Sequence, residues 1–326
     1  MWGNIKIFKY IEHSIITTKI LSNNTIFKNS IKNSLVIVVF HEVSDDPSKF
    51  HFNNNLNVTK QNFYNQLIFL KNNFNIISPL DLISKKFNTP AALITFDDGA
   101  KGFFNNAKPI LEDLKIPCIH FLNMEPILGG LNINGLVSYL LDVDKKIFNY
   151  FNTKNINTRN ITYNKIIKYL DNFDKSSIIN KAKEYHGPWA SIEDLEKCNK
   201  SNLIFFGNHL FNHYNCLNLE KNELIFQFNE NKKHLDKLKN SINFFSYPYG
   251  QPNIFYNHIT NSILNELGVK YIFSAFPIDY NLNNSVYHRL PIHDYVNTEN
   301  IFKKHILIAK FKGLIKKIYL KEYRIN

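Results

Sequence analysis

Short runs of β-branched and aromatic residues alternate with segments of helical periodicity through most of the chain. This alternation is typical of a parallel sheet in which each strand is followed by a helix that covers it. The predicted strands are residues 35–40, 92–96, 117–122, 203–206, 242–246 and 270–274. The predicted helices are residues 60–73, 104–115, 191–200, 221–240 and 254–267. The sequence therefore predicts an α/β fold with a parallel sheet or barrel.

Three regions fall outside this rhythm. Residues 125–190 are too long for a plain connection, so we expect a mostly helical insertion there. Of the formal net charge of +12, residues 1–33 carry +4 and residues 301–326 carry +7. We therefore expect a basic N-terminal extension, a main domain over 34–297 and a basic amphipathic C-terminal helix over 298–326. Because a nucleic-acid enzyme carries basic charge around its working groove rather than on its ends, no nucleic acid is expected as a partner.

The C-terminal segment has apolar residues near helical spacing between its lysines, namely Phe302, Ile306, Ala309, Leu314 and Ile318. This apolar face either packs on the main domain or lies on an anionic membrane surface. Packing is preferred for residues 301–311, and both alternatives are kept for 312–326. No run reaches the ~20 apolar residues of a transmembrane helix, and no signal peptide is identified. The expected location is the cytoplasm or the inner membrane surface.

Two adjacent aspartates follow the second predicted strand, in the run Thr95-Phe96-Asp97-Asp98-Gly99. Adjacent side chains of a strand point to opposite faces, but both can reach one cavity where the strand ends and the chain turns. Gly99 permits such a sharp turn. Two carboxylates there repel each other unless a cation binds one and leaves the other as a base. An ordinary Asp-Asp-Gly turn is the alternative.

Two histidines four residues apart, His209 and His213, follow the predicted strand over 203–206. On a helical turn this spacing brings both imidazoles to one side. With one carboxylate, they make the ligand set of a catalytic zinc site that keeps a position open for water. A pair of surface histidines is the alternative.

A third motif, Tyr247-Pro248-Tyr249-Gly250, follows the predicted strand over 242–246. Such a turn can direct a backbone N–H into a cavity and line it with an aromatic ring, although alone it is also an ordinary turn. Because each of the three motifs follows its own strand, all of them are expected at the C-terminal ends of the strands.

In this order, the three motifs resemble those of the polysaccharide deacetylase family, whose NodB-type domain is carbohydrate esterase family 4. The resemblance covers roughly residues 35–295 and includes Phe40-His41-Glu42-Val43, Pro109-Ile110-Leu111 with Ile116-Pro117, and WASIEDL over 189–195. The first of these and the Tyr-Pro-Tyr-Gly motif are similar to the membrane- and capsule-associated branch of the family. The implied fold is a distorted (β/α) barrel of about seven parallel strands, with its site at the C-terminal strand ends.

The resemblance also implies roles for individual residues. Asp97 matches the catalytic base, and Asp98, His209 and His213 match the ligands of a divalent metal ion, expected to be Zn²⁺. The backbone N–H of Tyr249 matches a group that stabilises the oxyanion. The implied reaction is hydrolysis of N-acetyl groups on amino sugars, with an acetylated glycan or a lipid- or nucleotide-linked amino sugar as partner. An O-acetyl glycan esterase and a non-catalytic member that binds glycan or a membrane surface are the alternatives.

The chain departs from the family pattern at two positions. Leu210 stands where Ser or Thr usually follows the first histidine, and Ser246 stands where an Arg often orients the base. Arg289 lies in His288-Arg289-Leu290-Pro291-Ile292, which looks like the R-x-P-I segment of the branch. It is expected either to orient Asp97 or to form an ordinary ion pair at a strand end.

The general acid is the least defined role. The family uses the histidine of a Leu-x-Ile-x-His motif, and His293 is one residue short of that spacing. His293 is therefore the candidate, and His288 is the alternate. His41 is expected either to line the pocket or to be held by backbone, and His120 to be a core residue. The run YHGPW over 185–189 is either a glycan-stacking surface or a packed loop.

Overall fold

The computed structural model describes residues 23–143, 170, 174–276 and 286–322, with the backbone alone from residue 314 onward. Nine described strands form one sheet in the order β10-β9-β8-β7-β6-β5-β1-β11, with β4 beside β5. Their bounds are β1 Leu35–Phe40, β4 Asn75–Ile76, β5 Ala91–Phe96, β6 Cys118–Leu122, β7 Ile204–Asn208, β8 Ser241–Ser246, β9 Tyr271–Ser274, β10 Tyr287–His288 and β11 Leu290–Pro291. All of their pairings are parallel, which confirms the predicted α/β class.

One extended segment closes this sheet into a barrel. β10 pairs with β9, whereas β11, one residue further along the chain, pairs with β1. The residue between them is Arg289, whose N–H donates to the carbonyl of Ser274 at 2.8 Å. β10, Arg289 and β11 therefore act as one closing strand. The path along the sheet contains eight strands. If β10 and β11 are counted as one closing strand, seven strands surround the barrel, which agrees with the prediction of about seven.

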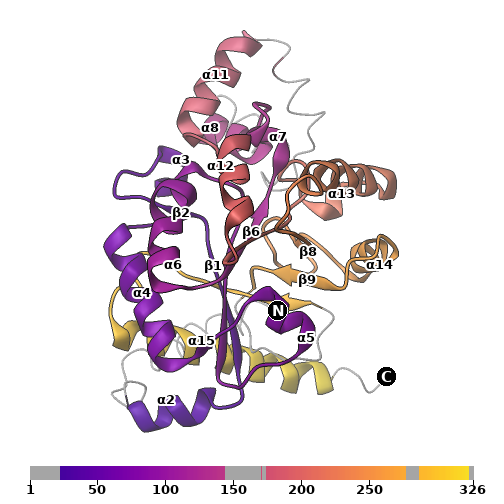
Figure 1. The fold of residues 1–326 in the computed structure, drawn as a ribbon. Coiled ribbons are helices and arrows are strands. Elements are labelled where there is room, and N and C mark those ends of the chain that lie inside the picture. The colour runs from indigo at the N-terminus through magenta and orange to yellow at the C-terminus, as the bar shows by residue number, and fades with distance from the viewer. Residues whose placement is uncertain (1–22, 144–169, 171–173, 277–285, 323–326) are drawn as a thin grey trace.

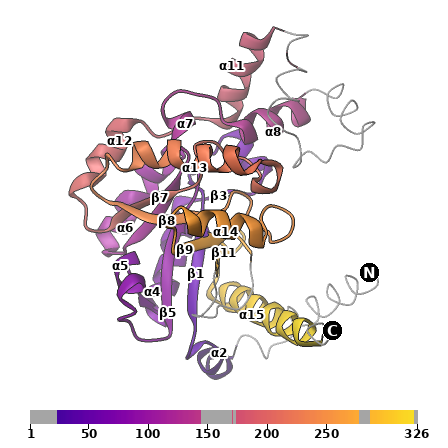
Figure 2. The ribbon, with the colours of Figure 1, turned by 90° about the vertical axis from the view of Figure 1, so that its right-hand side faces the viewer.

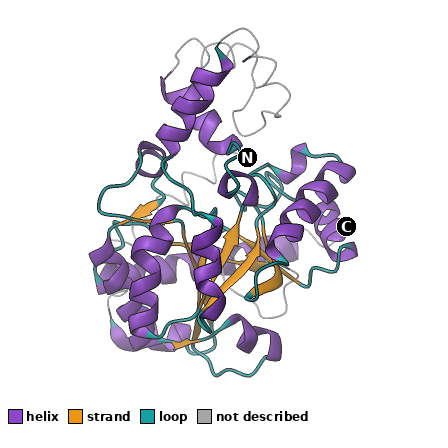
Figure 3. Cartoon of the chain, turned by 45° about the horizontal axis from the view of Figure 1, so that its top comes forward, coloured by secondary structure: helices purple, strands orange, loops and turns teal. Residues whose placement is uncertain are grey.

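Helices surround the strands (Figures 1 and 3). They are α2 Asn24–Ile31, α3 Lys49–Asn53, α4 Lys60–Asn73, α5 Pro79–Ser84, α6 Lys108–Leu114, α7 Met124–Ile127, α8 Ile133–Val143, α11 Lys175–His186, α12 Ile192–Lys197, α13 Lys221–Leu235, α14 His258–Glu266 and α15 Glu299–Glu322. Two short strands, β2 Glu42–Val43 and β3 Asn57–Val58, form a separate two-stranded parallel sheet.

The strands are buried on both faces. In β1, Leu35 and Ile37 belong to one cluster, which also contains Phe121 of β6, Phe244 of β8 and Phe273 of β9. The alternate residues of β1 belong to a second cluster, together with apolar side chains of α4 and α15. Burial on both faces explains why β1 is apolar at every position rather than at every second one.

The insertion helices α8 and α11 lie at one end of the molecule, and α15 lies at the opposite end (Figures 1 and 2). Within the predicted insertion, the described residues form α7, α8 and α11, while 144–169 lie outside the described part. Of the predicted N-terminal extension, α2 is described, and its Phe27 and Ile31 are buried in the main core. Residues 1–22 lie outside the described part.

The first half of α15 packs on the rest of the protein. Phe302, Ile306 and Ala309 are buried. The ring of Phe302 stacks on that of Phe69 in α4, with the centroids 4.4 Å apart. This is the arrangement that we preferred for residues 301–311, whereas the side chains of Leu314 and Ile318 are not described. No helix in the described part of the chain is long and apolar enough to cross a membrane.

Candidate active site

The predicted motifs meet at one end of the barrel. Asp97 follows β5 directly, His209 follows β7, and the Tyr-Pro-Tyr-Gly turn follows β8. Because these strands are parallel, their carboxyl ends lie at the same end of the barrel. A cavity of about 430 Å³ opens there, and its lining includes Asp97, Asp98, His213 and Tyr249.

The backbone after β5 explains how two consecutive carboxylates reach this cavity. Asp98 has a φ of 76° and Gly99 has a φ of 109°. The left-handed conformation of Asp98 turns the chain at once, so the two side chains do not alternate as they would along a strand. A Cβ at Gly99 would also lie 2.9 Å from Cδ1 of Ile127. The sharp turn was predicted from Gly99, and Asp is a residue type that tolerates the positive φ found at position 98.

His213 also lines the cavity and His209 lies against Asp98, but the segment that carries both histidines is not a helical turn. The segment from His209 to His213 is a bend, and Leu210 has a φ of 66°. The predicted helical turn is therefore wrong. The N–H of Leu210 donates to Oδ1 of Asn208 at 2.9 Å, and that of His213 donates to Oδ1 of Asn212 at 2.8 Å. These side-chain acceptors replace the carbonyls that a helix would use.

Asp98, His209 and His213 form a group that can hold a metal ion. Oδ1 of Asp98 lies 3.4 Å from Nε2 of His209 and 3.5 Å from Nε2 of His213. All three side chains are buried, and this oxygen has no hydrogen-bond partner among the described residues. A buried oxygen without a partner is costly, and a cation between the three atoms would satisfy it. The donor set therefore fits a divalent metal ion.

The protonation states of this group suit metal binding. Nδ1 of His209 donates to the carbonyl of Ser246 at 2.8 Å, which orients the ring so that Nε2 faces Asp98. Burial lowers the pKa of His213 to about 4, which leaves this imidazole neutral near pH 7. Burial alone would raise the pKa of Asp98, but the imidazoles of His213 and His209 hold it well below its ordinary value. Neutral imidazoles and an ionised carboxylate are the forms that bind metal.

Arg289 clamps the other carboxylate. Its Nη1 donates to Oδ1 of Asp97 and its Nη2 to Oδ2, both at 2.6 Å. Burial alone would raise the pKa of Asp97, but the guanidinium keeps it below its ordinary value. The ionised carboxylate lies close to the metal set, with Oδ2 3.9 Å from Nε2 of His209. Arg289 therefore lies where it can orient Asp97, and that role stays a prediction.

Ser246 takes part in this clamp from the position where the family often has an Arg. Its Oγ accepts from Nη2 of Arg289 at 2.6 Å, and Oγ1 of Thr95 accepts from Nη1 at 3.2 Å. The guanidinium carbon lies 5.2 Å from the ring centroid of Phe121, within the range of a cation–π contact. The cation beside Asp97 therefore comes from the closing strand of the barrel instead of from β8.

The Tyr-Pro-Tyr-Gly turn forms a wall of the cavity. Tyr249 has a φ of 60° and Gly250 has a φ of 71°, and a Cβ at Gly250 would lie 2.0 Å from the backbone nitrogen of Ala275. The ring of Tyr249 packs edge-on against His213, with the centroids 4.4 Å apart and the planes at 79°. Its hydroxyl donates to Oδ1 of Asn134 in α8 at 3.3 Å. The turn therefore connects a predicted metal ligand to the insertion.

Two histidines outside the metal set line the cavity, His293 and His41. Nδ1 of His293 donates to the carbonyl of Asn55 at 2.9 Å. Nδ1 of His288 lies 2.7 Å from Oγ of Ser274, and His288 is not among the described lining residues. Burial lowers the pKa of His41, and the charges of Asp98 and Asp97 oppose this shift. Of the two expectations for His41, the structure shows the one in which it lines the cavity, together with both carboxylates. The sequence feature that marked His41 was its position directly after the strand β1.

The remaining predicted histidines have structural surroundings. Nε2 of His120 donates to the carbonyl of Asp97 at 3.2 Å, and burial lowers the pKa of His120 to about 3. Tyr185 and His186 are buried, and the ring of His186 stacks on Trp189 with the centroids 4.1 Å apart. His120 is therefore a core residue, as expected. Of residues 185–189, Tyr185 and His186 end helix α11 and are packed, whereas Pro188 is exposed.

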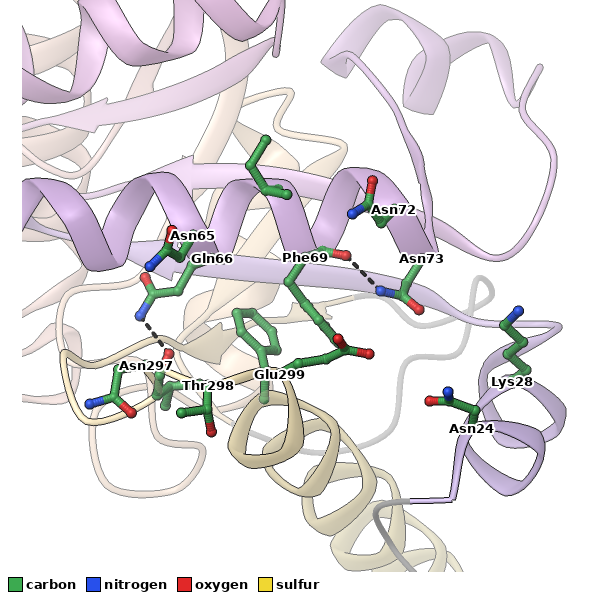
Figure 4. A pocket seen from close by; sticks show the side chains of 13 residues that line it. Asn24, Lys28, Asn65, Gln66, Phe69, Asn72, Asn73, Asn297, Thr298 and Glu299 are labelled. Carbon is green, nitrogen blue, oxygen red and sulfur yellow. Dashed lines mark hydrogen bonds between the residues drawn. The ribbon is translucent and has the colours of Figure 1, made fainter.

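A second hollow of about 430 Å³ lies between α2, α4 and the start of α15 (Figure 4). Asn24, Lys28 and Glu299 are among its lining residues, and no predicted site residue is. The side-chain amide of Gln66 donates to the carbonyl of Val296 at 3.0 Å and ties α4 to the segment before α15. Since this hollow lacks the carboxylates and imidazoles described above, we place the chemistry in the first cavity.

Comparison with protein families gives one match. Residues 134–272 match the sequence model of a family described as Polysaccharide deacetylase. The matched range contains His209, His213 and Tyr249, whereas Asp97 and Arg289 lie outside it. No curated protein sequence matches the chain.

Several solved structures share the fold. The deacetylase PplD of Streptococcus pyogenes, solved in complex with acetate, is 17% identical over 83% of this chain and 97% of that chain, with a TM-score of 0.56. A de-N-acetylase from Aggregatibacter actinomycetemcomitans is 16% identical over 83% and 99%, with a TM-score of 0.54. IcaB from Ammonifex degensii is 16% identical over 83% and 97%, with a TM-score of 0.53. The chain therefore matches the sequence model of the polysaccharide deacetylase family over residues 134–272 and shares its fold with solved deacetylases.

Proposed function

We propose that this chain is a metal-dependent hydrolase that removes N-acetyl groups from the amino sugars of a glycan. One observation carries the proposal: a buried set of metal-binding atoms lies beside an ionised carboxylate that is clamped in place. Hydrolysis assisted by a metal ion needs both parts, because the ion activates water and a base must take its proton. The relative from Streptococcus pyogenes was solved with acetate, which is the product such a reaction releases.

Asp98, His209 and His213 would hold the ion, which we expect to be Zn²⁺. When bound, it would polarise the acetyl carbonyl and lower the pKa of a water molecule. Asp97 takes the proton from the attacking water, because Arg289 keeps this carboxylate ionised and fixes both of its oxygens. We assign stabilisation of the developing oxyanion to the backbone N–H of Tyr249.

The leaving amine must receive a proton, and two histidines of the cavity lining are placed to give it. We assign this role to His293, the candidate from sequence, because it lines the cavity. His41 lines the same cavity and is the alternative donor, but burial lowers its pKa and so disfavours its protonated form. Both assignments are open to test by substitution.

Acetate release tests the proposed function directly. The full chain, loaded with Zn²⁺, is incubated with N-acetylated glycans, O-acetylated glycans and sugar nucleotides, each with and without a chelator. We expect acetate from an N-acetylated glycan, loss of that activity with chelator, and about one bound metal ion per chain. Release only from O-acetylated glycans would support the esterase alternative. Metal binding without any release would support a non-catalytic glycan-binding member.

A further inference from the structure

Helix α8 of the insertion has two faces with different surroundings. On one face, Ile133, Leu136 and Leu140 are buried and belong to one cluster with Ala182 of α11. The other face lines the cavity that contains the predicted metal set, through Asn134, Val137, Ser138 and Leu141. These four positions follow the i, i+3, i+4, i+7 spacing of a single helix face. We call them the α8 stripe.

The stripe belongs to a helix that is fixed at both ends. At its start, the N–H of Ile133 donates to Oδ1 of Asn212 at 3.0 Å, and the residue after Asn212 is a predicted metal ligand. Toward its end, the carboxylate of Asp142 accepts from the hydroxyl of Tyr185 and, at 2.7 Å, from Nδ2 of Asn53 in α3. Recognition requires groups held in place by their own supporting contacts, and the stripe meets this condition.

The chemistry of the cavity matches that of a sugar ring. Val137 and Leu141 offer apolar surface, while Asn134 and Ser138 offer an amide and a hydroxyl. Tyr249 and Phe255 also line the cavity, with their rings stacked 4.7 Å apart at 25°. A pyranose presents an apolar face of C–H groups and an edge of hydroxyls. Its recognition therefore needs aromatic or aliphatic surface combined with a few neutral hydrogen-bonding groups.

We propose that the α8 stripe is the recognition wall for the sugar that carries the acetyl group, and that this sugar is a neutral pyranose of a glycan. The inference rests on the proposed function and deepens it. The stripe supplies an amide and a hydroxyl, whereas a nucleotide diphosphate is recognised best by cationic groups. Through the contact of Asn134 with Tyr249, whose ring touches His213, the wall lies directly beside the predicted metal set.

A bulky substitution in the stripe tests the proposal. Ser138→Trp would fill the space in front of α8, and Ser176→Trp, at an exposed position of α11, is the matched control. The probes are N-acetylglucosamine tetramers with β-1,4 or β-1,6 linkages, and UDP-N-acetylglucosamine. Binding to the full Zn²⁺-loaded chain is measured by calorimetry, and acetate release is measured separately. Metal content per chain reports on the predicted metal set independently of sugar binding.

We expect Ser138→Trp to weaken tetramer binding about tenfold or more, the scale at which a pocket rejects a ligand it cannot accommodate. Metal content should stay that of the wild type, since the stripe does not include the metal set. Ser176→Trp should change neither binding nor hydrolysis. Leu141→Ala provides a second variant that adds no bulk, and it should raise KM for the tetramer about tenfold with kcat retained.

The outcomes separate this inference from the proposed function. Equal tetramer binding by the wild type and both stripe variants would overturn the recognition wall. Tighter binding of UDP-N-acetylglucosamine than of any tetramer, or no tetramer binding by the wild type, would overturn it too. If the stripe variants lose tetramer binding but no probe yields acetate in the wild type, the wall is supported and the proposed deacetylation fails.

Discussion

Replacing Arg289 by Met should destabilise the protein and impair the base at the same time. Methionine fills much of the same space but has no charge, so the carboxylate of Asp97, which is 2% exposed, loses its bidentate partner. Removing one partner of a buried ion pair costs about 3–5 kcal/mol, because the other charge stays desolvated without compensation. The hydrogen bonds to Thr95 and Ser246 are lost as well, which places the expected value in the upper part of that range.

The loss should depend on pH. In the wild type, the folded pKa of Asp97 lies below the unfolded value of about 3.9. The clamp therefore stabilises the protein above that pH, and its contribution is lost as the pH falls through the folded pKa. Without Arg289, burial raises the folded pKa of Asp97 above the unfolded value. The variant is then destabilised at neutral pH and recovers as the carboxyl group is protonated, so the two proteins differ most near pH 7.

Urea unfolding of the chelator-treated proteins at pH 7 and pH 4.5 measures this difference. Ser246→Ala is the control, because it removes one hydrogen bond and should cost about 1 kcal/mol at both pH values. In the Zn²⁺-loaded protein, Arg289→Met should lower kcat/KM at least about 10²-fold at pH 7, with a rate that rises with pH as Asp97 ionises. A loss of stability below about 1 kcal/mol at pH 7, or an equal loss at both pH values, would refute the reasoning.

Three further predictions concern the metal, the proton donor and the C-terminal helix. Asp97→Asn should abolish acetate release and retain bound metal, whereas His213→Ala should lower both acetate release and metal content. An acetate assay and metal analysis measure the two quantities. Near-normal acetate release by Asp97→Asn would exclude this residue as the base. His293→Ala should lower the rate roughly 10²–10⁴-fold in acetate assays, and a loss with His41→Ala alone would move the role to His41. The full chain should co-sediment with anionic liposomes at low salt, and truncation after Lys312 should reduce this; binding that is absent or unchanged by truncation removes the membrane interpretation.

The parts of the fold that sequence predicts are those with a strong periodic or apolar signal. The run LVIVVF over 35–40 coincides with β1, because a strand buried on both faces must be apolar throughout. Residues 60–73 coincide with α4, whose Phe63, Leu67 and Leu70 are buried on one face. Because these apolar runs mark where the strands end, they also predicted that Asp97 and His209 lie at the ends of their strands.

The parts that sequence does not predict depend on backbone conformation and on long-range pairing. Neither Asp98 nor Leu210 is a residue type that signals a positive φ as glycine does, yet both adopt one at the site. β10 and β11 have two residues each and include no apolar run, so no local pattern marks them as strands. These residues become strands because they pair with the two edges of the sheet, β10 with β9 and β11 with β1.

The closing strand also constrains the order in which parts of this protein can fold. β11 pairs Leu290 with Val38, so β1 cannot complete its edge until the chain as far as Pro291 has left the ribosome. Such non-local contacts form late, because the entropy of closing the long intervening loop must be met first. Since the same strand carries Arg289, the clamp on Asp97 forms at this last step. A chain that has not closed its barrel would therefore hold the predicted metal ligands without the clamp on Asp97, and the proposed hydrolysis would then report complete folding.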